Sequence, residues 1–531
     1  MQSDRESRPT SAVPAATGTE PAPARSRRGP VLVGLMLTMA LAAMDTTIVS
    51  TAVPQIVGSI GGFSIFSWLF SVYLLTQTVT IPVYGKLADL YGRKPVLLVG
   101  IAVFLIGSAA CSGAWSMVAL IVFRALQGIG AGAIQATVQT VAGDLYSLRE
   151  RGRVQGWLSS VWAVAAVAGP TLGGLFADYA SWRWIFLINL PIGALAVVLI
   201  VRFLHEAPSA GRRHRVDYAG STLILLACGV LVFALLQGGV AWAWGSAASI
   251  ACFAAAVLLG AAAVRVEQRA AEPVVPGWVW RERVVAGSNL GYIALGLLVI
   301  GPSTFLPTFA QTVLGYGAVA AGFVLATMSV SWPLAAALCS RLYLRIGFRD
   351  TALLGAVISA AGVALFLVLP FAPSVWAVVA STFVLGAGLG LVSTPLVVGV
   401  QSSVPRERRG VATGSLMFCR FLGQSLGAAV FGAIVNGTLQ SRLDDAPAAV
   451  ASSLPHEVDA VEPAVLGHRL GGGALRYLRE ALDAATHHVY AGLTVVAVLA
   501  VLALLVLPRR FPVLDQAPAE PGPPADGPGA A

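Results

Sequence analysis

The sequence is dominated by apolar runs that are long enough to cross a lipid bilayer. A helix that spans the hydrocarbon core needs about 20 predominantly apolar residues. We locate fourteen such runs, at about 31–54, 66–88, 96–114, 116–142, 156–177, 184–203, 219–238, 246–265, 286–309, 317–340, 351–371, 375–399, 411–436 and 486–508. Only 11% of the residues are charged and 57% are hydrophobic, a composition that excludes a water-soluble fold of this size. The sequence therefore predicts an all-α polytopic membrane protein with fourteen transmembrane helices.

The basic residues support this count and orient the chain. Short loops rich in Lys and Arg stay in the cytoplasm. With the N-terminus inside, each predicted cytoplasmic segment contains Lys or Arg, whereas the first six outer loops together hold only Arg183. We therefore expect a multi-pass protein of the plasma membrane with both termini in the cytoplasm. The net charge of +9 is explained by this orientation and does not indicate a nucleic-acid partner.

The chain also contains an internal repeat. A shift of 258 residues places Gly128 on Gly386 and Arg151 on Arg409, and a shift of 255 places Gly92 on Gly347. Shared helix-packing needs could align the glycines alone, but the loops and their basic residues match as well. Duplicated bundles are typical of secondary transporters, in which two halves expose a central site alternately to each side.

The repeat and the composition together divide the chain into segments. Both ends of the chain are expected to be cytoplasmic tails, and the first lacks apolar periodicity and is rich in Ser, Pro, Ala and Arg, which predicts disorder. The expected segments are a disordered tail (1–29), an N-terminal six-helix bundle (30–205), two inserted helices with their linkers (206–283), a C-terminal six-helix bundle (284–508) with a long outer loop (437–485), and a second disordered tail (509–531).

The segment between the second and third predicted helices carries a compact motif. It reads Gly85-Lys-Leu-Ala-Asp89-Leu-Tyr-Gly92-Arg93-Lys94. Gly85 permits close helix approach and Gly92 permits a tight turn. Asp89 at a helix end can pair with Arg93 or Lys94 and form a latch at the inner face.

The fifth predicted helix carries a second motif made of small residues. Its members are Gly156, Ala165, Gly169, Pro170, Gly173 and Gly174. Ordinary packing of small residues between membrane helices would explain part of this pattern. The Gly-Pro-xx-Gly-Gly ending is more specific than such a repeat.

These motifs resemble those of the major facilitator superfamily. The 85–94 segment is similar to its loop motif, Arg124-Ala-Leu-Gln127-Gly128 to its proton-relay motif, and the fifth-helix pattern to its antiporter motif, with alanine at the middle glycine position. Asp45-Thr-Thr47-Ile-Val-Ser50-Thr-Ala-Val-Pro54 resembles the helix-one motif of the fourteen-span drug:proton antiporters of the EmrB/QacA type, with Ser50 where asparagine is usual. The resemblance implies the major facilitator fold and proton-driven export of amphipathic small molecules.

Asp45 is the acidic residue that we predict to carry protons. It is the one acidic residue that lies well within a predicted apolar span, where a charged side chain costs roughly 2.5–3.5 kcal/mol on insertion scales. A low-dielectric surrounding disfavours the charged form of a carboxyl group, which lets it load and release protons. Arg124 is the expected partner. The alternatives are that Asp45 pairs statically or caps a broken helix, and that Arg124 only binds backbone.

The remaining predictions concern the substrate cavity and the partners. Trp68, Tyr73, Trp332 and Arg420 are candidate cavity residues, and Arg420 could bind an anionic or carbonyl group of a substrate or pair structurally. The five cysteines show no metal-binding spacing. We expect a monomeric transporter, not an enzyme, whose partners are a small-molecule substrate, protons and the bilayer, with no cofactor beyond the proton gradient. A proton-coupled importer and a non-transporting receptor are the rival hypotheses.

Overall fold

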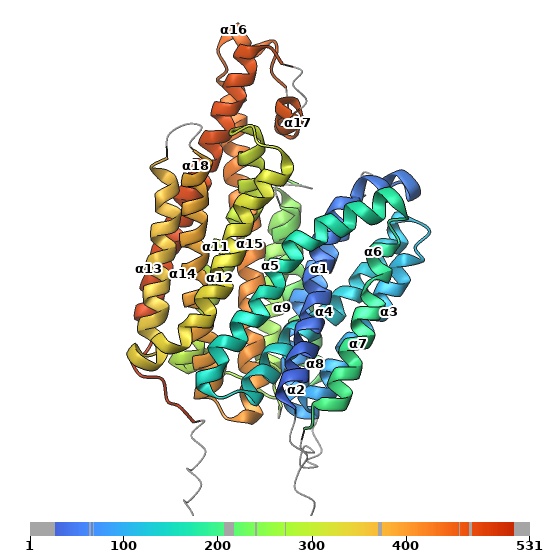
Figure 1. Cartoon of the computed structure of the whole chain (residues 1–531), viewed down its shortest axis with the longest axis vertical. Helices are drawn as coiled ribbons and strands as arrows, with labels where there is room; N and C mark the ends of the chain where they lie inside the picture. Colours follow the sequence, from blue (N-terminus) through green and yellow to red (C-terminus); the bar gives the residue numbers. More distant parts are fainter. Residues whose placement is uncertain are drawn as a thin grey trace, which may run out of the picture.

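The computed structural model describes an all-helical molecule whose long helices run side by side (Figure 1). The described residues are 27–62, 65–66, 68–206, 217–238, 242–270, 272–369, 374–455, 457–466 and 470–514. Most of the two predicted tails, 1–26 and 515–531, therefore lies outside the described residues.

The first six spans form the N-terminal bundle. Its helices are α1 (Arg28–Ile60), α2 (Trp68–Tyr91), α3 (Arg93–Ser112), α4 (Met117–Leu145), α5 (Leu148–Tyr179), and α6 (Trp184–Leu187) with α7 (Asn189–Phe203). Local chemistry sets several of these boundaries. Ser116 caps α4 by accepting a hydrogen bond from Ala119 N, and Ser147 opens α5 in a capping box with Glu150. Gly92, with φ of +96°, makes the turn between α2 and α3.

The rest of the chain forms the inserted pair and the C-terminal bundle. Its elements are α8 (Tyr218–Gln237), α9 (Ala247–Glu267), α10 (Trp278–Arg281), α11 (Arg283–Thr312), α12 (Ala318–Ile346), α13 (Phe348–Leu367), α14 (Val375–Ser403), η2 (Arg406–Arg408), α15 (Arg409–Asp444), α16 (Ala448–Ala451), η3 (Val458–Ala460), α17 (Val461–Leu466) and α18 (Gly472–Leu505). The inserted α8 packs against α2 and α15 and so contacts both bundles.

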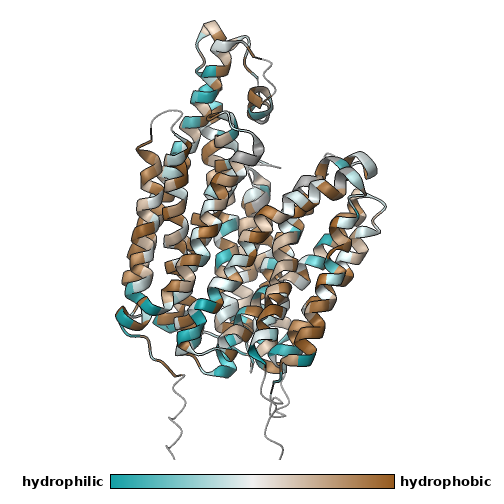
Figure 2. Cartoon of the chain, in the orientation of Figure 1, coloured by the Kyte–Doolittle hydropathy of each residue, from teal (hydrophilic) through white to brown (hydrophobic). Residues whose placement is uncertain are grey.

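The surface of the helices is apolar over most of their length. Figure 2 shows hydrophobic residues along the middle of the helices and hydrophilic residues toward their ends. Val257 and Leu258 of α9 are each 70% exposed. A large exposed apolar surface is unfavourable in water but favourable in contact with lipid. Within the described residues, twelve helices are long and apolar enough to cross a membrane. The count of fourteen adds α2 and α8 and stays a prediction.

The internal repeat is confirmed by the helix boundaries. The bounds of α14 are those of α4 displaced by 258 residues, and those of α13 are those of α3 displaced by 255. Gly347 repeats the positive φ of Gly92. Gly130 lies against Gly100 of α3, and the corresponding Gly388 lies against Gly355 of α13. Each glycine lets two helix backbones meet at the same point of its own bundle.

Two segment predictions need correction. The segment 437–485 is largely helical, because α15 continues to Asp444 and α18 begins at Gly472. The two helices extend together beyond the apolar runs and bury Leu439 and Leu478. Hydropathy missed them because charged residues cover their outer faces.

The beginning of the predicted C-terminal tail is also ordered. Phe511 is only 8% exposed and packs on Phe348, with ring centroids 5.5 Å apart. Leu514 N donates a hydrogen bond of 2.8 Å to Ser402 O. A few apolar residues amid polar ones give no periodic signal, so the sequence did not reveal this contact.

Candidate functional site

A buried ion pair lies inside the N-terminal bundle. Asp45 of α1 and Arg124 of α4 are 0% and 1% exposed, and Arg124 Nη1 donates to Asp45 Oδ2. Gln127 Nε2 donates to the other carboxylate oxygen at 2.8 Å. Arg124 Nη1 also donates to Gln127 Oε1 at 2.9 Å. The candidate relay residues Arg124 and Gln127 therefore enclose the one acid that the sequence placed deep in a span.

Other helices complete the surroundings of this pair. Arg124 Nε donates to Leu69 O at 3.2 Å, and its guanidinium carbon lies 4.2 Å from the ring centroid of Tyr73, both on α2. Ser108 of α3 accepts hydrogen bonds from Gln127 at 3.3 Å and from Asn189 of α7 at 3.0 Å. Arg124 thus pairs with Asp45 and in addition donates to the backbone of α2, so the alternative of backbone binding alone is not what the structure has.

The burial of the pair determines what protonation must do. Removing one partner of a buried ion pair is destabilising by roughly 3–5 kcal/mol, because the other charge is left without compensation. Protonation of Asp45 removes its charge in the same way and leaves Arg124 as an isolated cation. When Asp45 takes up a proton, the helices around Arg124 must therefore move, or another negative charge must approach Arg124.

The inner-face motif connects the two bundles. The Asp89 carboxylate accepts hydrogen bonds of 2.8 Å from the backbone N of Gly410 and of Val411, at the beginning of α15. A helix N-terminus attracts a carboxylate in this way. Arg93 pairs with Asp89 at 3.0 Å. Lys94 does not pair with it and donates to Leu204 O at 2.6 Å instead.

Asp144 at the end of α4 is a site residue that the sequence analysis missed. It pairs with Arg93 at 3.1 Å and with Arg409 of the C-terminal bundle at 3.0 Å. In the repeat, Arg151 corresponds to Arg409, and Arg151 donates to Ser402, the counterpart of Asp144, at 3.2 Å. The repeat could have revealed both contacts, because each arginine reaches the end of the matching helix in the opposite bundle.

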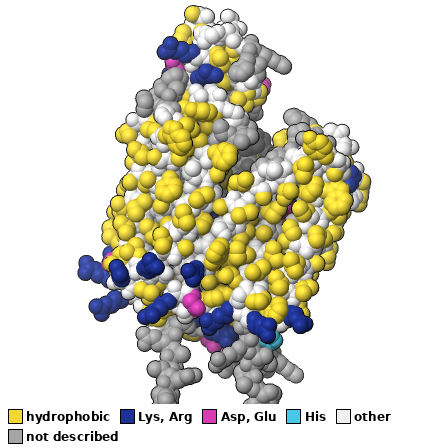
Figure 3. Space-filling view, viewed as in Figure 1, with side chains coloured by type: hydrophobic (Ala, Val, Ile, Leu, Met, Phe, Trp, Pro, Cys, Tyr) yellow, Lys and Arg dark blue, Asp and Glu magenta, His cyan; other side chains and the backbone are white. Residues whose placement is uncertain are grey.

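Small residues bring the bundles together at the same end. A Cβ on Gly85 would lie 2.6 Å from Gly410 O, and one on Gly156 would lie 2.7 Å from the Cβ of Ala337 in α12. Basic side chains gather at this end of the molecule, whereas the two lobes separate at the other end (Figure 3). The described conformation is therefore closed at its basic face.

The rest of the fifth-helix motif lies against α1. A Cβ on Gly169 would lie 2.0 Å from Thr47 Oγ1 and 3.2 Å from Ile48 N. Thr47 Oγ1 donates to Ala165 O at 2.9 Å. Gly173 is buried, Pro170 lies within α5, and a Cβ on Gly174 would meet nothing within 4 Å. The contact of Thr47 with α5 lies two residues along α1 from Asp45.

The four candidate cavity residues occupy three separate environments. Trp68 packs on Phe233 of the inserted α8, with ring centroids 5.6 Å apart. Tyr73 is 1% exposed and belongs to the ion-pair site. Trp332 lies over Arg420, whose guanidinium carbon is 5.4 Å from a Trp332 ring centroid.

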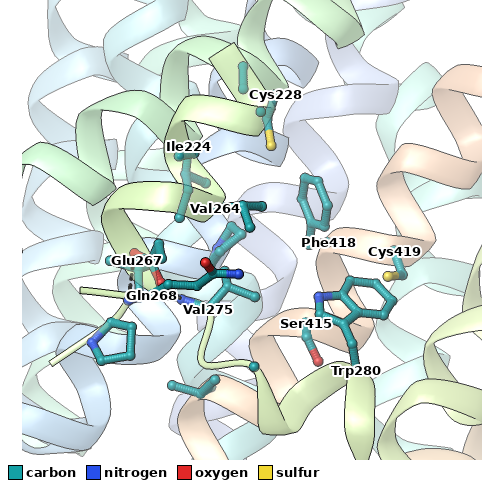
Figure 4. Close-up of a pocket in the computed structure, with 18 residues that line it drawn as sticks. Ile224, Cys228, Val264, Glu267, Gln268, Val275, Trp280, Ser415, Phe418 and Cys419 are labelled. Carbon is teal, nitrogen blue, oxygen red and sulfur yellow. Dashed lines mark hydrogen bonds between the residues drawn. The ribbon is translucent and has the colours of Figure 1, made fainter. Parts of the chain in front are cut away.

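The inserted helices form a separate cavity, which the sequence analysis did not predict. Its volume is about 330 Å³, and it lies between α8, α9 and α15 (Figure 4). Most of its lining is apolar. Glu267 is held at its rim by accepting from the backbone N of Val274 at 2.9 Å and of Val275 at 3.0 Å. These hydrogen bonds fasten the linker that follows α9 to the end of that helix.

Comparison with known proteins identifies the fold family. The family model of the Major Facilitator Superfamily matches residues 35–428. The chain belongs to the major facilitator superfamily. Among solved structures, this superfamily member is similar to the human organic anion transporter MFSD10 (TETRAN), with a TM-score of 0.58, 14% identity, and coverage of 90% of this chain and 100% of that one. That likeness shows the fold alone.

Its curated relatives are transporters. The multidrug transporter protein MdtP of Bacillus subtilis is 34% identical over 436 residues, which cover 82% of this chain and 80% of the relative. Multidrug resistance protein 3 of the same bacterium is 34% identical over 417 residues, or 78% and 81% of the two chains. This superfamily member is thus a membrane transporter and not an enzyme. Among its described residues, no group of three or more His, Cys, Asp or Glu could hold a metal ion.

The first prediction compares two glycines of one helix. Gly169→Ala should destabilise the protein by roughly 1–3 kcal/mol and reduce transport, because the new methyl group overlaps Thr47. Gly174→Ala meets open space and should change stability by less than about 1 kcal/mol. Thermal unfolding and substrate efflux of both variants measure this. Equal behaviour of the two would show that the α1–α5 contact has no special role.

The second prediction concerns closure at the basic face. Asp144→Asn removes the charge shared by Arg93 and Arg409 and should favour separation of the bundles there. Spin labels at Tyr91 and Leu344, both exposed near that end, should report longer distances in the variant than in the wild type. Asp350→Asn, at an exposed acid that begins α13, is the matched control. Unchanged distances in Asp144→Asn would exclude a latch role.

Proposed function

We propose that the protein is a proton-driven antiporter that exports amphipathic small molecules across the plasma membrane by alternating access. The observation that carries this proposal is the buried Asp45–Arg124 pair, since a carboxylate enclosed in a membrane bundle is a proton-binding group by its chemistry. The similarity to a multidrug transporter and a multidrug resistance protein of Bacillus subtilis supports export of drugs. Proton coupling and antiport rest on the site itself.

Protonation of Asp45 has a direct mechanical route to the bundle interface. Thr47 follows Asp45 on α1 and is fastened to α5 through Ala165 O and the Gly169 contact. Toward its N-terminus, the same α5 contacts α12 at Gly156. A shift of α1 around a neutral Asp45 therefore moves the helix that joins the bundles at the basic face.

The latch defines the two states between which the protein alternates. In the described state, Asp89 and Asp144 hold α15 and Arg409 against the N-terminal bundle. Opening at the basic face exchanges these contacts for water. Substrate is then taken up from the cytoplasm, and closure with release at the other face allows protons to enter.

The orientation of the carrier follows from its basic face. Lys and Arg gather at the end where the described chain begins and where α18 ends, and such an excess marks the cytoplasmic side. Both termini are then cytoplasmic, and the lobes open outward. The charges inside the predicted spans bear on the substrate: Asp45 is assigned to the proton, and Arg124 and Arg420 are cations. They favour neutral, zwitterionic or weakly anionic compounds over dications, because each buried cation would require its own carboxylate.

The third prediction tests proton coupling. Asp45→Asn should reduce transport driven by a pH gradient in proteoliposomes to the level of empty liposomes, because asparagine keeps the shape of the side chain but carries no proton. Binding of the substrate is expected to persist. Asp350→Asn, an exposed acid on the same basic side, should transport like the wild type.

Two results separate the outcomes of this experiment. A folded Asp45→Asn variant that still binds substrate and shows no gradient-driven flux supports the assignment. Gradient-dependent flux at the wild-type rate in that variant would show that another group carries the proton. Flux into, rather than out of, correctly oriented cells would favour an importer.

A further inference from the structure

Arg420 is a deep cation that forms no ion pair with any described residue. It lies within α15, and its Nε has no hydrogen-bond partner among the described residues. Its Nε is fully buried in this unpaired state. Arg124, the other deep arginine, is paired with Asp45. The charge of Arg124 is therefore compensated by a carboxylate, whereas Arg420 forms no ion pair with a described residue.

The surroundings of Arg420 are rigid and aromatic. Trp332 presents its ring to the guanidinium, and its Nε1 donates to Ser393 Oγ at 3.1 Å. Tyr292 of α11 donates to Ser393 O at 2.9 Å. A Cβ on Gly296 would lie 2.1 Å from Arg420 O, so the absence of a side chain there lets α11 hold the α15 backbone closely. The backbone that carries Arg420 is therefore packed closely against α11.

Arg420 also lies close to the boundary between the bundles. Trp332 directly precedes Pro333, whose carbonyl oxygen would lie 3.0 Å from a Cβ on Gly156 of α5. The ring that covers Arg420 therefore belongs to the stretch of α12 that touches the N-terminal bundle. A ligand held there would contact both halves of the carrier.

The N-terminal bundle offers a polar group at a similar depth. Gln77, Ile81 and Gly85 share one face of α2, and Gly85 contacts Gly410 of the antiparallel α15. At 1.5 Å per residue, Gln77 and Arg420 lie about 12–15 Å from that contact on their respective helices. Gln77 Oε1 is buried and has no partner among the described residues. An amide and a guanidinium are thus both free near the bundle boundary.

The geometry points to Arg420 as the recognition site for the acidic group of an exported aromatic acid. A guanidinium binds a carboxylate through two parallel hydrogen bonds, and the Nε donor of Arg420 has no partner among the described residues. Trp332 supplies a ring for stacking with an aromatic body. This assignment rests on the proposed function and adds its substrate class, aromatic weak acids, together with the residue that reads the charge.

Binding to the purified protein in nanodiscs tests this assignment without a proton gradient. The probes are 1-naphthoate, 2-naphthoate and 9-anthroate, each paired with its uncharged carboxamide, and the measurement is isothermal titration calorimetry. The wild type should bind at least one carboxylate about tenfold or more tightly than its amide, as a charge-assisted hydrogen bond would give. The preference should disappear as the pH falls below the pKa of the probe acid.

Variants assign the preference to Arg420. Arg420→Gln should abolish it while weakening amide binding less than about threefold, and Arg420→Lys should retain part of it, because lysine keeps the charge without the planar fork. Arg345→Gln, at an exposed arginine of the basic face, is the matched control and should behave as the wild type. Thermal unfolding verifies that each variant is folded.

Three results would overturn the assignment: no carboxylate preferred over its amide by the wild type, an undiminished preference in folded Arg420→Gln, or equal loss in Arg345→Gln. If Arg420→Gln does not fold, the assignment is decided by the carboxylate preference of the wild type and by its partial retention in Arg420→Lys. Asp45→Asn separates this assignment from the proposed function. Gradient-driven flux at the wild-type rate in that variant would overturn the proposed proton site, whereas a carboxylate preference that persists there would leave the recognition site at Arg420 standing.

Discussion

The structure depends on one constraint, that the negative charge of Asp45 inside the membrane bundle must be compensated. Asp45 is tolerated because Arg124 and Gln127 donate to both of its carboxylate oxygens. Any change in the proton occupancy of Asp45 upsets this balance. The surrounding helices must then respond, and α1 is connected through Thr47 to α5 and from there to the opposite bundle. In the proposed mechanism, protonation of Asp45 therefore moves the bundles because it removes the charge that compensates Arg124.

The internal repeat shows how one scaffold supports two kinds of chemistry. The glycines that permit helix contact recur in both halves, but Thr382 occupies the position of Arg124 and Leu344 that of Asp89. Thr382 makes a 2.8 Å hydrogen bond with Thr327 and carries no charge. In the proposed mechanism the N-terminal half holds the proton site and the latch acid, whereas the C-terminal half holds Arg420, which forms no ion pair with a described residue. Duplication preserved the packing and divided the function.

Much of this arrangement was predictable from sequence, and the failures have identifiable physical causes. A lone acid in an apolar span and an arginine in a neighbouring span must find each other, so Asp45 and Arg124 were predicted as a pair. Asp144 was missed because it lies near a helix end, where hydropathy does not distinguish a solvated acid from one that binds Arg409. Arg93 and Lys94 stayed alternative partners of Asp89, because spacing along a turn does not show that the end of α7 offers Lys94 carbonyl groups. The cavity of the inserted helices depends on tertiary packing and has no local signal.

The claim that Asp45 couples proton movement to substrate is tested most directly by counting protons. Purified protein in weakly buffered solution, with a pH-sensitive dye, receives a transported substrate, and proton release is recorded at a pH where the empty carrier is protonated. The account predicts a proton released for each substrate bound by the wild type and by Asp350→Asn, and none by Asp45→Asn with binding intact. Equal release by Asp45→Asn would contradict it.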